Sequence, residues 1–372
     1  MLAAEQINDE GGVIGRYFEI VGEDNDESES VRDMNKISAA LTRLITYHKV
    51  DYVIGGYRTD AMMVMQDIIA EHKKIFLSIA TPSDALTQRV VDNYNKYRYY
   101  FRVCPPNSTA SLMEILNSLV VLREYTGFNK VAYLAEDVLW AEGVAVGLDF
   151  YLSEVYDFDI VYKAKFPPGT TDFTSYFAAI ESSGAEILIP LIGGEESILV
   201  SKEWYDRQSP LVVWGVDIPA QANEYWQWTG AKCECTTAMG SPFVAGYPWT
   251  NETLPAREAF IDRWGHTPVF TAQSAYDVIR FILADAIERA GTTETDAVIE
   301  SLEETEIETT DSRCFVFTSS HDIMFGPGYT TAIFFQWQED GSRVPVYPKE
   351  IMEEAGATYA CPPWPGPWDE IS

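Results

Sequence analysis

Short apolar runs rich in valine, isoleucine and tyrosine alternate with stretches of helical periodicity along most of this chain, and the alternation constrains the fold more than any other feature. Each run has the length of a strand, and the connections are short. This pattern is typical of βαβ units, in which a helix links two parallel strands. The sequence therefore predicts an α/β fold with doubly wound parallel sheets.

A first set of units precedes the Pro105-Pro106 pair, which removes backbone donors and disfavours helix before residue 108. We expect helices at 2–8, 31–45 and 61–69, and strands at 17–21, 52–55, 75–78 and 100–103. The pair therefore predicts a first domain boundary.

A second set follows, with helices at 111–125, 142–155, 173–181 and 195–205 and strands at 130–135, 159–166, 187–191 and 211–214. Long helices at 256–264, 274–290 and 297–302 then return without matching strands, so we expect the chain to re-enter the first domain. The predicted lobes are 1–104 plus 241–318 and 105–240 plus 319–372. From 347 onward the tail is too rich in proline for a helix or a central strand, which predicts an extended strap.

One expectation concerns the start of the chain. A doubly wound sheet of order 2-1-3-4-5 has its first strand in the middle, but this chain begins at the helix that should follow that strand. We therefore expect the native chain to extend upstream by a strand, its loop and an export signal.

Charge and composition exclude several classes of function. Lysine and arginine total 26 against 57 acidic residues, a net charge of −31, which repels nucleic acids and anionic membranes. The charge fits a saline or exposed compartment, or serves solubility alone. No apolar run of about 18 residues is present for a membrane-spanning helix.

Signals for catalysis, metals and cofactors are absent from the sequence. The four histidines are far apart, and neither a serine-nucleophile elbow nor a phosphate-binding glycine loop occurs. We expect no enzyme activity, no metal and no cofactor. Five cysteines leave at least one thiol unpaired, and a bridge among Cys104, Cys233, Cys235 and Cys314 is left open.

Small polar residues follow two neighbouring strands of the first half. Gly56-Tyr57-Arg58-Thr59 follows the strand at 52–55, with Thr59 at the predicted N-cap of a helix, and Ala80, Thr81 and Ser83 follow the next strand. Ligands of open α/β sheets bind at the carboxyl ends of strands, and free backbone N–H groups there bind carboxylates. Thr59 could equally serve as a helix cap only.

Three residues of the second half follow strands in the same way. Asp217 could receive an ammonium group or cap the helix after it, and Trp140 could cover an apolar part of a ligand or belong to the core. Gly193 follows the strand at 187–191.

These segments resemble a known family. Glu5-Gln-Ile-Asn-x-x-Gly-Gly-x-x-Gly15, together with the segments at 51–56, 78–87, 101–103, 274–278 and 335–341, is similar to the leucine/isoleucine/valine-binding proteins of ABC transporters. The resemblance covers nearly the whole chain. It implies the type I periplasmic-binding fold, two lobes joined by three crossovers, the third near 317–325, and an extracytoplasmic location.

The resemblance also implies a function and a site. A small zwitterion, such as an amino acid or an amide-like relative, is captured by closure of the two lobes and delivered to a membrane permease. Thr59, with Ala80 and Thr81 or Ser83, holds the carboxylate, Asp217 holds the ammonium group, and Trp140 packs on the ligand. Gly193 stands where many relatives carry an aromatic residue, which implies a roomier pocket. The alternative is a ligand-sensing regulatory protein or receptor ectodomain on the same fold.

Overall fold

The computed structural model describes residues 1–27, 33–104 and 106–370, and the chain folds into two compact units. Unit 1 comprises Met1–Asn107 and Pro248–Thr331, and unit 2 comprises Ser108–Tyr247 and Ala332–Ser372. The chain thus crosses between units three times, after Asn107, Tyr247 and Thr331. The sequence predicts the three crossings after residues 104, 240 and 318.

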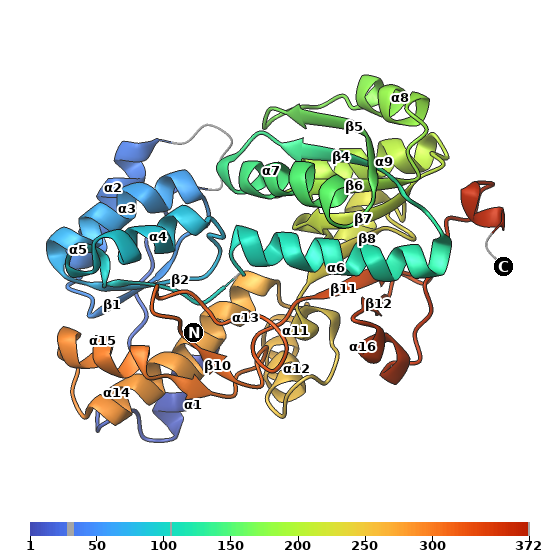
Figure 1. Ribbon diagram of the computed structural model, residues 1–372. Coiled ribbons are helices and arrows are strands. Elements are labelled where there is room, and N and C mark those ends of the chain that lie inside the picture. Colours follow the sequence, from blue (N-terminus) through green and yellow to red (C-terminus); the bar gives the residue numbers. More distant parts are fainter. Residues whose placement is uncertain (28–32, 105, 371–372) are drawn as a thin grey trace. The chain divides into compact units, whose positions relative to one another are not determined.

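Unit 1 is a small parallel sheet covered by helices on both faces (Figure 1). Its strands, in the order β1-β2-β3, are β1 (Tyr52–Gly55), β2 (Ile75–Ser78) and β3 (Tyr100–Arg102). The helices from the first segment are α1 (Leu2–Asp9), α2 (Met34–Thr46), α3 (Thr59–His72), α4 (Asp84–Asp92) and α5 (Tyr94–Tyr97). The second segment adds α12 (Thr253–Trp264), α13 (Phe270–Asp277), the π-helical turn η2 (Val278–Leu283), α14 (Ala284–Ala290), α15 (Thr295–Glu303) and the short antiparallel pair β9 (Glu306–Ile307) and β10 (Phe315–Val316).

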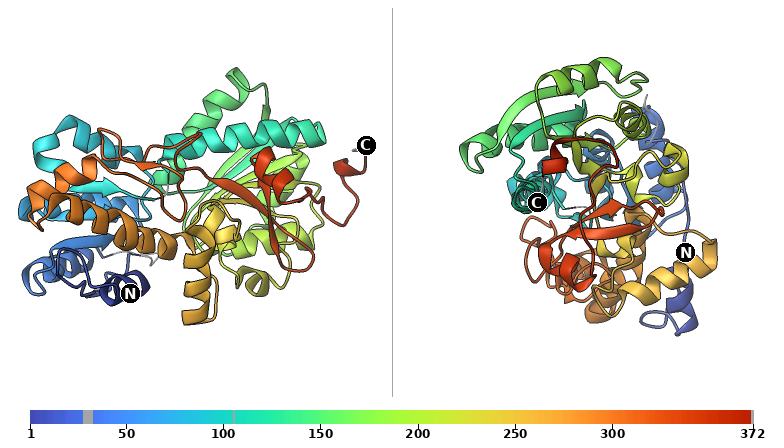
Figure 2. Two further views of the ribbon diagram at one scale, coloured as in Figure 1. Left: turned by 90° about the horizontal axis from the view of Figure 1, so that it is seen from below. Right: turned by 90° about the vertical axis from the view of Figure 1, so that its right-hand side faces the viewer.

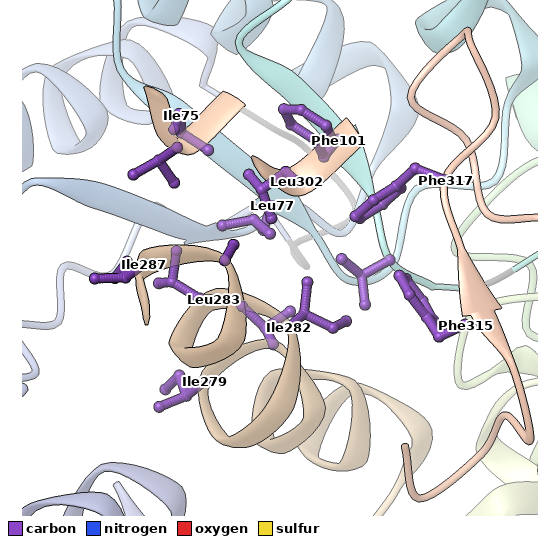
Figure 3. Close-up of a cluster of buried hydrophobic side chains, with 14 of the residues drawn as sticks. Ile75, Leu77, Phe101, Ile279, Ile282, Leu283, Ile287, Leu302, Phe315 and Phe317 are labelled. Atoms are coloured by element: carbon purple, nitrogen blue, oxygen red, sulfur yellow. The ribbon is translucent and has the colours of Figure 1, made fainter. Parts of the chain in front are cut away.

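Alternate side chains of this sheet enter two separate cores, as the two-residue period of a strand requires. Ile75, Leu77 and Phe101 pack against the helices of the second segment, including Ile282 and Leu283 (Figure 3). Val53, Phe76 and Tyr100 point to the other face and pack against α2, α3 and α4. The second segment of the chain therefore supplies one whole layer of unit 1, in agreement with the predicted re-entry.

The strand predicted at 17–21 is not formed, and the pairing nearest to these residues is an isolated bridge between Val13 and Arg16. The backbone of Phe18 is instead paired with the side-chain amide of Asn8, which donates to the Phe18 carbonyl and accepts from the Phe18 N–H, both at 2.8 Å. This amide satisfies the groups that a neighbouring strand would otherwise bind. Residues 31 and 32 of the helix predicted at 31–45 lie outside the described residues.

A buried ion pair explains why residues 319–331 belong to unit 1. Arg102, at the end of β3, is fully buried and forms a two-pronged pair with Asp322, with Nε to Oδ1 at 2.7 Å and Nη2 to Oδ2 at 2.8 Å. The N–H of Arg102 also donates to the His321 carbonyl at 2.9 Å. Because a buried charge requires its partner, the segment around Asp322 stays with β3.

We expect Asp322→Ala to destabilise unit 1 by about 3–5 kcal/mol, because Arg102 would remain buried without its counter-charge. Replacing both residues together, as Arg102→Met with Asp322→Leu, should recover much of that loss. Urea unfolding measures both changes. As a control, Glu10→Ala, which removes an exposed partner of Arg280, should cost less than about 1 kcal/mol; an equally small loss in Asp322→Ala would contradict the assignment.

Unit 2 contains a seven-stranded sheet of order β12-β11-β8-β7-β6-β4-β5. Its strands are β4 (Lys130–Glu136), β5 (Asp159–Phe166), β6 (Ile187–Ile192), β7 (Val212–Asp217), β8 (Thr237–Gly240), β11 (Ile333–Trp337) and β12 (Arg343–Tyr347). Its helices are α6 (Ser108–Thr126), α7 (Leu139–Glu154), α8 (Thr174–Ser182), α9 (Glu196–Asp206), η1 (Pro219–Gln221), α10 (Tyr225–Thr229), α11 (Pro242–Ala245), α16 (Lys349–Glu354) and η3 (Pro367–Glu370). The predicted elements at 111–214 all occur, with ends shifted by a few residues.

The sheet of unit 2 is doubly wound. The strands from β5 to β8 are parallel, whereas β11 and β12 add an antiparallel pair beside β8, seen in orange-red in Figures 1 and 2. From β4 the chain moves outward to β5 and then crosses back to β6 on the other side of β4. Helices α6 and α7 consequently cover one face, and α8 and α9 cover the other (Figure 1). The winding direction reverses between β4 and β6, a point at which open α/β sheets bind ligands.

The tail differs in part from the predicted strap, since residues 349–354 form α16. Beyond it the chain is extended and anchored by side chains. Gln336 of β11 exchanges two hydrogen bonds with the backbone of Ala360, and Trp364 packs on Trp204 at 4.8 Å between ring centroids. All five cysteines lie in the described part of the chain and are free thiols.

Within residues 1–27, 33–104 and 106–370, no helix combines the length and the apolar character that crossing a membrane requires.

Candidate functional site

In unit 1 the strand ends lie level with one another. The parallel register pairs Gly55 with Ser78 and Ser78 with Arg102. The segments that follow β1 and β2 therefore begin side by side at the carboxyl edge of the sheet. These are the two segments that the sequence singled out.

The turn after β1 requires glycine. Gly55 and Gly56 both have positive φ angles, and a Cβ on Gly56 would lie 3.1 Å from the sulfur of Met62. Helix α3 begins at Thr59, and the residue before it, Arg58, has extended dihedral angles. The N-cap is therefore Arg58, whereas the sequence predicted Thr59.

The hydroxyl of the Thr59 side chain makes no hydrogen bond to the described residues. Thr59 is only 6% exposed, and its Oγ1 is buried. A buried hydroxyl without a partner is unfavourable in the unliganded protein. This is the property expected of a group that binds a ligand.

A carboxylate that the sequence did not single out also lies at this helix start. Glu27 Oε1 accepts the N–H of Tyr57 at 2.8 Å, and the side chain of Asn25 and the backbone N–H of Arg58 also favour the charged form of this carboxylate. Burial of the side chain raises the pKa of Glu27. Tyr57 and Arg58, both predicted site residues, therefore contribute their backbone N–H groups, and the guanidinium of Arg58 lies 5.4 Å from the centre of the Tyr57 ring.

The three candidates after β2 differ in their access to a ligand. The hydroxyl of Thr81 is fully buried and bonded to the hydroxyls of Ser78 and Tyr100. Ala80 is also buried, whereas Ser83 is half-buried, precedes α4 as its N-cap and makes no side-chain capping bond. Arg102 fixes this segment by donating to the carbonyls of Thr81 and Ser83 at 2.7 and 3.0 Å. Of the two hydroxyls that the sequence left open, Ser83 is thus the more accessible.

In unit 2 the strand ends also lie level, and two of them carry buried acids. Ala135 pairs with Leu191, and Ile192 pairs with Asp217, so that Glu136 and Asp217 end their strands on either side of β6. Glu136 is 1% exposed and Asp217 is 7% exposed. Both lie at or next to the place where the winding of the sheet reverses.

The carboxylate of Glu136 accepts hydrogen bonds from the backbone of the turn that follows β6. Its Oε2 accepts the N–H groups of Gly193 and Gly194 at 2.9 and 3.2 Å. A Cβ on Gly193 would lie 3.4 Å from both this oxygen and the indole Nε1 of Trp140. The space that an aromatic residue at 193 would need is therefore occupied here by Trp140, whose ring is half-buried at the start of α7.

Asp217 is a buried acid without a cation. Its Oδ1 accepts the N–H of Ala220 at 3.2 Å, and its Oδ2 accepts the hydroxyl of Tyr225 at 2.9 Å. The first contact is the capping role that the sequence left open. No cationic side chain of the described residues pairs with Asp217, and burial raises its pKa to about 6.

We expect Asp217→Asn to stabilise the protein at neutral pH. The folded-state pKa lies above the unfolded value, so stability present below about pH 4 is lost as the pH rises through about 6, by about 2–3 kcal/mol. Asparagine keeps an acceptor for Ala220 and places a donor beside Tyr225 without the charge. Urea unfolding should show equal stabilities near pH 4 and a more stable variant above pH 6; a variant that is less stable at both would contradict this.

Sequence reasoning missed Glu27 and did not assign a role to Glu136. Glu136 is an acid that directly ends an apolar strand, which is a usable signal. Glu27 lies in a run of acidic residues that looks like an ordinary solvated surface. Its contact with Tyr57 spans 30 positions and exists only through the folded chain.

Comparisons with known proteins agree with this architecture. A family model described as "Periplasmic binding protein" matches residues 1–342. A Leu/Ile/Val-binding protein homolog 7 of Brucella abortus is 22% identical over 200 residues, which make up 53% of this chain and 47% of that protein. The matched region thus spans about half the length of the curated relative.

Solved structures share the fold at low identity. A leucine binding protein, LivK, of Thermotoga maritima has a TM-score of 0.76 at 17% identity and covers 92% of this chain and 91% of its own. The substrate binding protein LivJ of Streptococcus pneumoniae, in complex with isoleucine, has a TM-score of 0.75 at 18% identity, covering 92% of each chain. A solute binding protein of Rhodopseudomonas palustris BisB5, in complex with 3,4-dihydroxybenzoic acid, has a TM-score of 0.76 at 16% identity, covering 92% and 88%.

The type I periplasmic-binding fold inferred from the sequence is therefore confirmed. The chain belongs to the periplasmic binding protein family.

Proposed function

We propose that this chain is the extracytoplasmic solute-binding component of an ABC importer, and that it captures a small zwitterion, an amino acid or an amide-like relative, for a membrane permease. The family match supports the general role. The ligand class rests on the strand-end residues of the two units, and above all on Asp217.

Asp217 supports an ammonium group as part of the ligand. This buried carboxylate has no cationic partner among the described residues; it has lost its hydration and accepts hydrogen bonds from Ala220 and Tyr225. A ligand ammonium group would supply the missing charge and further donors, in a charge-assisted contact of the stronger kind. An anionic ligand would bring a like charge to this acid.

The carboxylate of the ligand is assigned to unit 1. The hydroxyl of Thr59 has no hydrogen-bond partner in the described part of the chain, and Ser83 presents its hydroxyl at the N-terminus of α4. The N-terminus of α3 carries the positive end of a helix dipole. Ala80 and Thr81 then shape the segment after β2, with the Thr81 hydroxyl internal to it. Tyr57 and Arg58 contribute backbone N–H groups at the start of α3.

Trp140 and Gly193 are assigned to the apolar part of the ligand. The indole of Trp140 leaves a large aromatic surface half exposed beside Gly193. Aromatic surface of this kind buries aliphatic side chains well. The pair thus favours an amino acid with an apolar side chain.

We expect isothermal titration calorimetry with a panel of amino acids and their amides to find a binder with an apolar side chain. Asp217→Asn should weaken this binding at least about tenfold, because the charge-assisted contact with the ammonium group is lost. A matched control is Glu114→Gln, which neutralises another buried acid of unit 2 whose pKa is raised to about 7 by burial. That variant should bind as tightly as the unchanged protein.

Two results would overturn the proposed ligand class. One is equal binding by Asp217→Asn and the unchanged protein. The other is binding of benzoate or 3,4-dihydroxybenzoate in preference to every amine, by analogy with the Rhodopseudomonas palustris relative. Benzoate therefore belongs in the titration panel.

A further inference from the structure

The anion position at the start of α3 is already occupied by the protein's own carboxylate. Glu27 is 8% exposed, and its Oε1 accepts the Tyr57 N–H at 2.8 Å. The side chain of Asn25 and the backbone N–H of Arg58, at the same helix start, also favour the charged form of this carboxylate. The backbone N–H groups at the start of α3, which the proposed function assigns to the ligand carboxylate, are therefore in contact with the Glu27 side chain.

This internal contact is incomplete. Glu27 Oε2 is buried and has no hydrogen-bond partner among the described residues, and the neighbouring hydroxyl of Thr59 also lacks one. A buried carboxylate with one unpartnered oxygen has given up hydration without full replacement. If the side chain moved into water, it would give up its hydrogen bond from Tyr57 and regain hydration for both oxygens.

The backbone around Glu27 is held independently of that contact. Glu23 pairs with Arg43 and His48, and Asp26 pairs with Lys36, so the loop is attached to α2 on one side of Glu27. The N–H of Glu27 donates to the side chain of Asn25 at 3.3 Å. Movement of the Glu27 side chain alone would thus free the helix start, with the backbone of residues 23–27 staying in place.

We propose that Glu27 is an internal substitute for the ligand carboxylate, and that a ligand binds by displacing it from the N–H groups of Tyr57 and Arg58. This inference deepens the proposed function, because it rests on a ligand carboxylate binding in unit 1. It makes Glu27 a specificity-determining residue: a ligand group can bind there only if it binds these N–H donors better than Glu27 does, with the hydroxyl of Thr59 as an additional partner.

The displacement has a measurable consequence. When a binding-competent state is populated only in part, the apparent affinity falls by that fraction. Occupancy by Glu27 therefore lowers the affinity for every carboxylate, whereas a ligand that does not use these N–H groups is unaffected. Removal of the Glu27 charge should tighten binding of acids selectively.

The first experiment uses acetate and propionate as minimal probes, so it does not depend on the identity of the natural ligand. In ¹⁵N-labelled protein, the amide signals of Tyr57 and Arg58 should shift on addition of acetate at about tenfold lower concentration in Glu27→Ala than in the unchanged protein. Glu27→Gln, which keeps the size of the side chain, covers the case in which the alanine variant does not fold. Glu71→Gln, which removes an exposed acid at the other end of α3, should behave like the unchanged protein.

The second experiment compares L-leucine with L-leucinamide by calorimetry. Glu27→Gln should bind leucine about tenfold more tightly and leucinamide unchanged. The inference is overturned if acetate shifts the two amides equally in all proteins, or if Glu27→Gln binds both probes as the unchanged protein does or more weakly. Failure of the proposed function looks different: no amine binds and Asp217→Asn has no effect, while the acetate result still stands by itself.

Discussion

Parallel strands end at a common edge, and this constraint places the strand-end residues of the candidate site. In unit 1 the register aligns Gly55, Ser78 and Arg102, and in unit 2 it aligns Ile192 with Asp217. Each strand end carries a helix start or a polar turn immediately after it. Because backbone N–H groups are unsatisfied at helix starts, these edges collect donors without any special side chain.

Buried charges at the two edges are satisfied to very different degrees. In unit 1 the guanidinium of Arg102 donates to Asp322, to Thr87 and to the carbonyls of Thr81 and Ser83. It fixes the segment after β2 and leaves no donor for a ligand. Within the residues that the structure describes, Asp217 by contrast has no counter-charge, and one carboxylate oxygen of Glu27 has no hydrogen-bond partner. A fully hydrogen-bonded charge such as Arg102 is typical of a rigid structural element. Buried acids with incomplete pairing are typical of ligand-binding sites, where they lower the stability of the protein.

Most of the secondary structure could be predicted from the sequence, because the period of apolar residues reports directly on helix and strand. The differences from the prediction have identifiable physical causes. The run at 17–21 has the composition of a strand, but the side-chain amide of Asn8 forms hydrogen bonds with both the N–H and the carbonyl of Phe18. The sequence predicts the third crossing after residue 318, whereas unit 1 extends to Thr331 in the structure; the pairing of Arg102 with Asp322 spans 220 positions and leaves no local pattern. The proline-rich tail nevertheless contains α16, which lies before its densest prolines.

The sequence by itself determined the α/β fold, the two-unit organisation and the strand ends at which polar residues gather, since each follows from local period and from the geometry of parallel strands. The tertiary structure decided which of those residues can still bind a ligand. The hydroxyl of Thr81 is hydrogen-bonded to Ser78 and Tyr100, whereas the hydroxyl of Thr59 has no partner among the described residues, and Glu27 reaches the start of α3. The physical reason is that hydrogen-bond satisfaction depends on groups brought together from distant parts of the chain, and no local pattern records them.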